Sequence, residues 1–169
     1  MAKIIGLLLI ALTCGVLPLG AAAQAQVLGP DAEACHAGAR GPAVLVHVQG
    51  FKDRAGRVRL QYYTDKPDEY LASGKYLRRV ELPVTASGDM AICITLPSPG
   101  RYAFVVLHDR DSDGRLSIWS DGIGFSRNPR LGFAKPASTS TVVECGPGVE
   151  VMNIVLNYRR GLSVRPVEG

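Results

Sequence analysis

Residues 43–49 read Ala-Val-Leu-Val-His-Val-Gln, with a valine at every second position. Successive side chains of a β-strand point to opposite faces, so this alternation predicts a strand with one buried face. Residues 58–64 continue the pattern, because Val58, Leu60 and Tyr62 again fall on one face. The intervening residues 51–56 are rich in Lys, Asp, Arg and Gly, which indicates that the two strands form a hairpin.

Further strand-like runs follow along the chain at residues 77–84, 89–96, 101–108, 138–145 and 149–158. The segment Pro97-Ser98-Pro99-Gly100 is a strong turn signal between two of them. No longer run shows the periodicity of an amphipathic helix. We therefore expect an all-β fold, an antiparallel two-sheet sandwich of about seven strands over residues 43–158, with one long ordered loop at 109–135.

The composition is that of one ordinary globular domain. The chain has 169 residues, of which 47% are hydrophobic and 20% charged, and its net charge is +4. This apolar content excludes a disordered tail or a collagen-like repeat, and the length excludes a multi-domain enzyme. Lys and Arg are scattered and are not interleaved with aromatic residues, so we expect no binding to nucleic acid.

The first 25 residues have the features of a secretory signal peptide. Lys3 provides a positive start, residues 4–12 an apolar stretch, and Ala23-Gln24-Ala25 small residues at a cleavage position. We predict a signal peptide at residues 1–25 that is cleaved after Ala25. The mature protein would then be periplasmic or secreted, with an N-terminal extension at 26–42 and a C-terminal tail at 159–169.

Two alternatives for this segment fit less well. A membrane anchor would need about 20 uninterrupted apolar residues, and Pro18, Gly20 and Gln24 interrupt this stretch. Attachment of a lipid at Cys14 would need leucine and two small residues directly before the cysteine. Residues 11–13, Ala-Leu-Thr, match this pattern poorly. We therefore expect no membrane span once the signal peptide is removed.

Export leaves Cys35, Cys93 and Cys145 in a compartment that permits disulfides. Because three is an odd number, at most one pair forms within the chain. No Cys-x-x-Cys motif or histidine cluster accompanies them, which argues against zinc binding and redox catalysis. We interpret them as structural cysteines.

The segment that carries chemistry is residues 108–114, His-Asp-Arg-Asp-Ser-Asp-Gly. Carboxylates at every second position followed by glycine are typical of the first half of a calcium loop, in which glycine permits a sharp turn. The next ligand positions of such a loop would be filled by the backbone carbonyl of Arg115 and by Ser117. Asp121 would replace the glutamate that usually comes last. The candidate calcium ligands are Asp109, Asp111, Asp113, Arg115, Ser117 and Asp121. The alternative is a solvated turn whose aspartates bond their own backbone.

Three aromatic residues lie in or next to the rest of the loop, at Trp119, Phe125 and Phe133. In one interpretation, these side chains anchor the loop by packing against the end of the sandwich. In the other, Trp119 and Phe125 form a binding surface for a sugar or peptide.

A hydrolase is a third alternative. It would use His108, Asp109 and Ser126, and it needs the base and the nucleophile in hydrogen-bond contact. The sequence contains no complete catalytic motif, which favours a protein that is not an enzyme.

Several motifs in residues 101–136 resemble those of a family of exported bacterial proteins, the domain of unknown function 2141. They are Tyr102-Ala103 leading into His108-Asp109, Gly124-Phe125-Ser126 with Asn128, and Gly132-Phe133 before Pro136. The resemblance extends over roughly residues 43–158 and implies an immunoglobulin-like or prealbumin-like sandwich. It also implies a disulfide between Cys35 and Cys93, with Cys145 free. The family often has an acidic residue where Ser117 stands, which weakens the match to a calcium site.

Together these features predict an exported β-sandwich that serves as a binding or envelope-associated module, with calcium ordering the Asp-rich loop. Its expected partner is a small molecule, a glycan or an envelope protein, and we expect a monomer.

Overall fold

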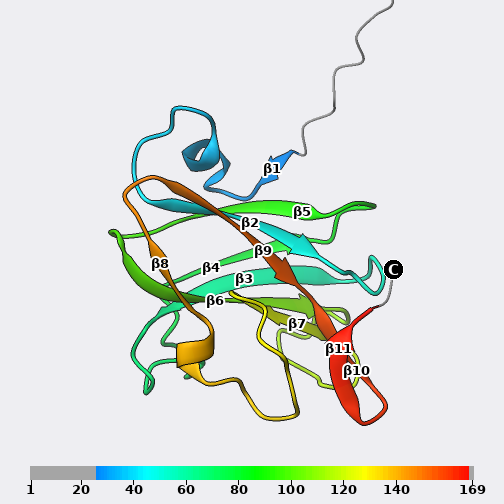
Figure 1. Cartoon of the computed structure of the whole chain (residues 1–169). Coiled ribbons are helices and arrows are strands. Elements are labelled where there is room, and N and C mark those ends of the chain that lie inside the picture. The colour runs from blue at the N-terminus through cyan, green and yellow to red at the C-terminus, as the bar shows by residue number, and fades with distance from the viewer. Residues whose placement is uncertain (1–25, 168–169) are drawn as a thin grey trace, which may run out of the picture.

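The computed structural model describes residues 26–167, which form two β-sheets packed face to face (Figure 1). The four-stranded sheet has the order β1 (Val27–Leu28), β5 (Met90–Thr95), β2 (Ala43–Gln49) and β9 (Val149–Val155). The predicted all-β sandwich is confirmed. The signal peptide and the Cys14 alternative lie outside the described residues. Within residues 26–167, no helix is long and apolar enough to cross a membrane.

The seven-stranded sheet carries the site discussed below. Its order is β11 (Ser163–Pro166), β10 (Asn157–Arg160), β7 (Gly122–Phe125), β6 (Gly100–Asp109), β3 (Arg57–Thr64) and β4 (Arg78–Pro83), and β8 (Val142–Cys145) also pairs with β6. Two short 3₁₀ helices complete the described elements, η1 (Ala32–Cys35) and η2 (Ser138–Ser140). Most strand pairs are antiparallel, but β1 with β5 and β2 with β9 are parallel.

Strand β6 lies at the centre of the larger sheet. One of its edges pairs with β3 over the full length of β3, from Arg57 opposite Asp109 to Thr64 opposite Tyr102. Its other edge is shared, since β8 pairs with its first residues and β7 with residues 105–108. Every residue of β6 from Tyr102 onward is buried. Both faces of this strand are therefore covered.

Two apolar clusters cover these faces. The larger lies between the sheets and includes the alternating residues predicted from the sequence, which are Val44, Val46, Val48, Val58, Leu60 and Tyr62. Phe104 and Val106 of β6 belong to it. The smaller cluster includes Val105 of β6 and Phe125 of β7, together with Tyr63 and Tyr70. Because side chains alternate along a strand, the consecutive residues His108 and Asp109 point to opposite sides of the sheet.

The described chain has eleven strands where the sequence predicted about seven. Residues 149–158, expected as one strand, form β9 and β10 in different sheets, with Leu156 between them. Asn157, the first residue of β10, is buried. The hairpin of β10 and β11 occupies most of the expected C-terminal tail, and β7 lies inside the expected loop at 109–135.

The N-terminal extension is fixed to the sandwich by covalent and polar contacts. The disulfide between Cys35 of η1 and Cys93 of β5 is confirmed, and Cys145 is free and buried. Burial raises the pKa of the Cys145 thiol to about 11. Asp31 accepts a hydrogen bond of 2.7 Å from Nε of Arg78 and one of 2.9 Å from the backbone N–H of Thr95.

The disulfide is expected to contribute substantially to stability, because it closes a loop of 58 residues and so restricts the unfolded chain. The loop-entropy relation gives about 4 kcal/mol. Urea unfolding of the wild-type protein with and without a thiol reductant measures this difference. The Cys35→Ala variant, which cannot form the bridge, should not respond to the reductant. An equal free energy of unfolding for oxidised and reduced wild-type protein would contradict the prediction.

Candidate metal site

His108, at the end of β6, is fully buried and hydrogen-bonded through both ring nitrogens. Its Nδ1 lies 2.6 Å from the hydroxyl of Tyr158, and its Nε2 lies 2.8 Å from the carbonyl oxygen of Ala55. Because a carbonyl only accepts, Nε2 carries the proton and the Tyr158 hydroxyl donates to Nδ1. Burial lowers the pKa of His108 and raises the pKa of Tyr158 to about 12. Both side chains are therefore neutral at pH 7.

Gly122 makes the contact between Tyr158 and His108 possible. In the register of the sheet, His108 lies opposite Gly122 of β7, and Gly122 lies opposite Tyr158 of β10. The Tyr158 ring occupies the space where a side chain of residue 122 would begin, so a Cβ there would collide with it. The glycine thus lets the tyrosine hydroxyl reach across one strand to the histidine. The sequence offered no sign of this pairing.

Asp109 lies on the opposite side of the sheet and is 3% exposed. Its Oδ2 accepts a hydrogen bond of 2.9 Å from the backbone N–H of Gly114, which adopts a φ of +79° in the sharp turn expected there. Its Oδ1 is buried and has no hydrogen-bond partner among residues 26–167. A buried carboxylate oxygen without a partner is costly, so this atom is available to accept a hydrogen bond or to coordinate a cation.

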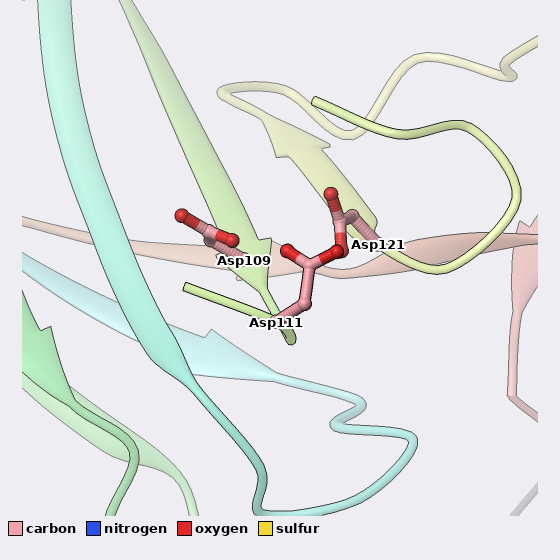
Figure 2. Close-up of side chains that lie close together, drawn as sticks. All are labelled: Asp109, Asp111 and Asp121. Atoms are coloured by element: carbon pink, nitrogen blue, oxygen red, sulfur yellow. The ribbon is translucent and has the colours of Figure 1, made fainter. Parts of the chain in front are cut away.

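Asp111 and Asp121 complete a group of three carboxylates with Asp109. One oxygen atom from each lies within 4.8 Å of the others (Figure 2). Asp121 is 3% exposed, whereas Asp111 is exposed. The Asp121 carboxylate is held in place by the N–H of Ser117 at 2.8 Å and the N–H of Arg110 at 3.2 Å. The arrangement can hold a hard cation that prefers oxygen ligands.

Two arginines hold the loop around this group. Arg110 forms an ion pair with Asp53, in which Nε lies 2.9 Å from the carboxylate, and its Nη1 donates to the carbonyl of Ser120. The hydrogen bond from Arg110 holds the pKa of Asp53 below its usual value. Arg59 donates to the carbonyl of Gly114 at 3.0 Å. These contacts place the loop backbone against β3 and the hairpin at residues 51–56.

The structure brings together three of the six predicted ligands. Asp113 is outside the group, and its Oδ1 accepts a hydrogen bond of 2.7 Å from the N–H of Arg115. This is the Asx turn of the alternative interpretation. Ser117 contributes its backbone N–H to Asp121, and Arg115 is exposed. The loop therefore has features of both the turn and the metal site. Asp113 forms a turn, and Asp109, Asp111 and Asp121 form a carboxylate group.

The two aromatic residues predicted to bind a ligand do not form a common surface. Trp119 is 73% exposed, while Phe125 is 3% exposed and belongs to the smaller apolar cluster. Instead, the guanidinium of Arg159 lies over the Trp119 ring, 3.4 Å from its centroid, and 5.6 Å from the centroid of the Phe133 ring.

The residues of the hydrolase alternative are engaged with other partners. Both ring nitrogens of His108 are taken by Tyr158 and Ala55. Ser126 is fully buried, where its Oγ donates to the carbonyl of Thr141 and accepts from the N–H of Phe104. The structure thus gives Ser126 no contact with a general base.

Comparison with known proteins identifies the family. The profile of the family described as "Uncharacterized protein conserved in bacteria (DUF2141)" matches residues 46–152. The chain belongs to the DUF2141 family. The matched region includes His108 and the three carboxylates but ends before Tyr158. No curated protein and no solved structure shows significant similarity.

The buried His108 is expected to make stability depend on pH. Its pKa is about 6.5 in the unfolded chain and lower in the folded protein, so the unfolded state binds more protons as the pH falls below about 6.5. The stabilisation present above that pH is then lost, by at most about 1.4 kcal/mol per pH unit, until the pH falls below the folded pKa. Urea unfolding at several pH values between about 7.5 and 5.5 measures the loss.

The His108→Gln variant should lack this dependence, whereas His36→Gln, at an exposed position, should retain it. EDTA is included throughout so that cation binding does not contribute. Parallel stability profiles for the wild type and His108→Gln would show that His108 does not cause the effect.

Proposed function

We propose that this DUF2141 protein is an exported, non-enzymatic binding module in which Asp109, Asp111 and Asp121 bind a calcium ion that orders the loop at residues 110–121. The observation that supports the proposal most strongly is the buried carboxylate of Asp109, which belongs to a group of three carboxylates and whose Oδ1 has no hydrogen-bond partner among residues 26–167. A cation at this point supplies the missing partner and offsets the repulsion among three negative charges.

The chemistry of the group favours calcium. All three side chains offer carboxylate oxygens, which are hard ligands. One oxygen of each lies within 4.8 Å of the others, which is compatible with coordination to one cation at a calcium–oxygen distance of ~2.4 Å. Calcium also accepts 6–8 ligands in irregular geometry, so water molecules on the exposed side of Asp111 can complete the coordination.

Two observations support export. The sequence of residues 1–25 has the pattern of a signal peptide. The Cys35–Cys93 disulfide is typical of an oxidising compartment outside the cytoplasm. Such compartments also contain calcium at concentrations sufficient for weak sites, since extracellular modules bind it with dissociation constants of about 10⁻⁴–10⁻³ M.

The burial and hydrogen bonds of the candidate catalytic residues support a role in binding rather than catalysis. His108 and Ser126 are each buried and hydrogen-bonded to partners that fix their positions. The loop at residues 110–121, in contrast, is mostly exposed and contains Trp119. An ion that orders this loop would order the surface that a partner meets.

Calcium is expected to raise the thermal stability of the mature protein. A ligand that binds only the folded state stabilises it by about 2.7 kcal/mol at 100 times its dissociation constant. Melting curves in EDTA and in excess calcium measure this stabilisation, and calorimetric titration gives the stoichiometry, expected to be one ion per chain.

Asp111 and Asp113 provide a matched pair of variants. Both are exposed aspartates of the same turn, and each accepts a hydrogen bond from the backbone N–H two residues further on. Only Asp111 belongs to the carboxylate group. Asp111→Ala should abolish the calcium-dependent rise in melting temperature, and Asp113→Ala should preserve it. Loss of the effect in both variants, or in neither, would contradict the proposed ligand set.

A further inference from the structure

A small apolar pocket opens on the outer side of the larger sheet, next to the carboxylate group. Its floor includes Ile123 and Phe125 of β7, and its walls include Leu116, Ile118 and Leu131 from the loops on either side. The pocket has a volume of about 160 Å³. Three of the seven exposed large apolar side chains of the described residues, Leu116, Ile118 and Phe133, lie on its border.

The volume limits what the pocket can hold. An engineered apolar cavity of about 150 Å³ binds one benzene molecule, so this pocket accommodates a single aromatic ring or a branched aliphatic group of similar size. A fatty acyl chain or an extended glycan is too large to be enclosed. The apolar lining also disfavours a sugar, whose hydroxyl groups would lose their hydrogen bonds to water.

Two cations lie at the pocket, Lys135 and Arg159. The Nε of Arg159 donates to the carbonyl of Gly161, and its guanidinium is stacked on Trp119. Among residues 26–167, neither Lys135 nor the two Nη groups of Arg159 form an ion pair with a carboxylate. Stacking holds the guanidinium in a fixed orientation, which favours recognition of a carboxylate by two parallel hydrogen bonds.

We propose that this pocket binds a carboxylate attached to one apolar group of about the size of an aromatic ring. The ring enters between Ile118 and Leu131 above Phe125, and the carboxylate meets Arg159 and Lys135 at the edge. Two sources carry this chemistry, a free arylalkanoic or branched-chain acid and the C-terminal residue of a peptide. The inference does not depend on calcium, although Asp121 contributes to both sites.

The test is a calorimetric titration of the mature protein with 3-phenylpropionate, carried out both in EDTA and in calcium. Fluorescence of Trp119, the single tryptophan of the chain, provides a second signal because Arg159 is stacked on its ring. We expect saturable binding to one site, with a dissociation constant below about 10 mM in EDTA, in calcium or in both. The affinity is weak because so small a ligand makes few contacts. The corresponding neutral amide, 3-phenylpropanamide, should bind about tenfold more weakly or worse, because it lacks the charge.

Three variants test the residues. Arg159→Gln should weaken binding of 3-phenylpropionate about tenfold, and Arg40→Gln, which removes the same charge from an exposed position in the N-terminal extension, should leave it unchanged. Ala134→Trp, at an exposed position on the pocket border, should abolish binding by filling the pocket. Circular dichroism shows whether each variant is folded.

The tripeptide Ala-Ala-Phe distinguishes the two sources. Tighter binding of the tripeptide than of 3-phenylpropionate, lost on amidation of its C-terminus, supports a peptide terminus as the ligand. Binding of 3-phenylpropionate alone supports a small free acid. The proposal is overturned if neither compound saturates, if the acid and its amide bind equally, or if Arg159→Gln binds as well as Arg40→Gln. The calcium proposal fails separately, through the melting curves of the aspartate variants.

Discussion

Strand β6 ends in two consecutive polar side chains that are both buried, and the need to provide them with partners shapes the surrounding structure. His108 faces the space between the sheets, and Asp109 faces the outer side. Buried polar groups are stable only when hydrogen bonds or charges replace the water that they lose. The hairpin at residues 51–56, strand β10 and the loop at 110–121 all contribute such partners.

The two side chains are satisfied to different degrees. His108 uses both nitrogens, because the glycine at position 122 leaves space for Tyr158 and the hairpin presents the carbonyl of Ala55. Asp109 uses only one oxygen in a hydrogen bond with residues 26–167, and its carboxylate lies in a group with two further carboxylates. The histidine side therefore resembles a completed core, while the aspartate side has the properties of a binding site. The family match includes both residues, although Tyr158 lies beyond it.

Much of the fold follows from short-range sequence patterns, whereas the site depends on long-range pairing. The valines of residues 43–49 predicted a buried face correctly, and the spacing of Asp109 and Asp111 led to the metal hypothesis. The third carboxylate comes from Asp121, because the next residue, Gly122, pairs with His108 and brings Asp121 beside the end of β6. Local spacing predicted Asp113 as the third carboxylate and Asp121 only as a substitute for the usual final glutamate. The division of residues 149–158 between two sheets was likewise invisible, since both halves alternate like one strand.

The central claim is that the unpartnered oxygen of Asp109 is completed by a cation. A crystal structure of the mature protein grown with calcium, with anomalous data collected at long wavelength, tests it most directly. We expect an anomalous peak about 2.4 Å from Oδ1 of Asp109, with oxygens of Asp111 and Asp121 in the same coordination sphere. A map without such a peak, in which a water molecule or a protein donor hydrogen-bonds to Oδ1, would contradict it.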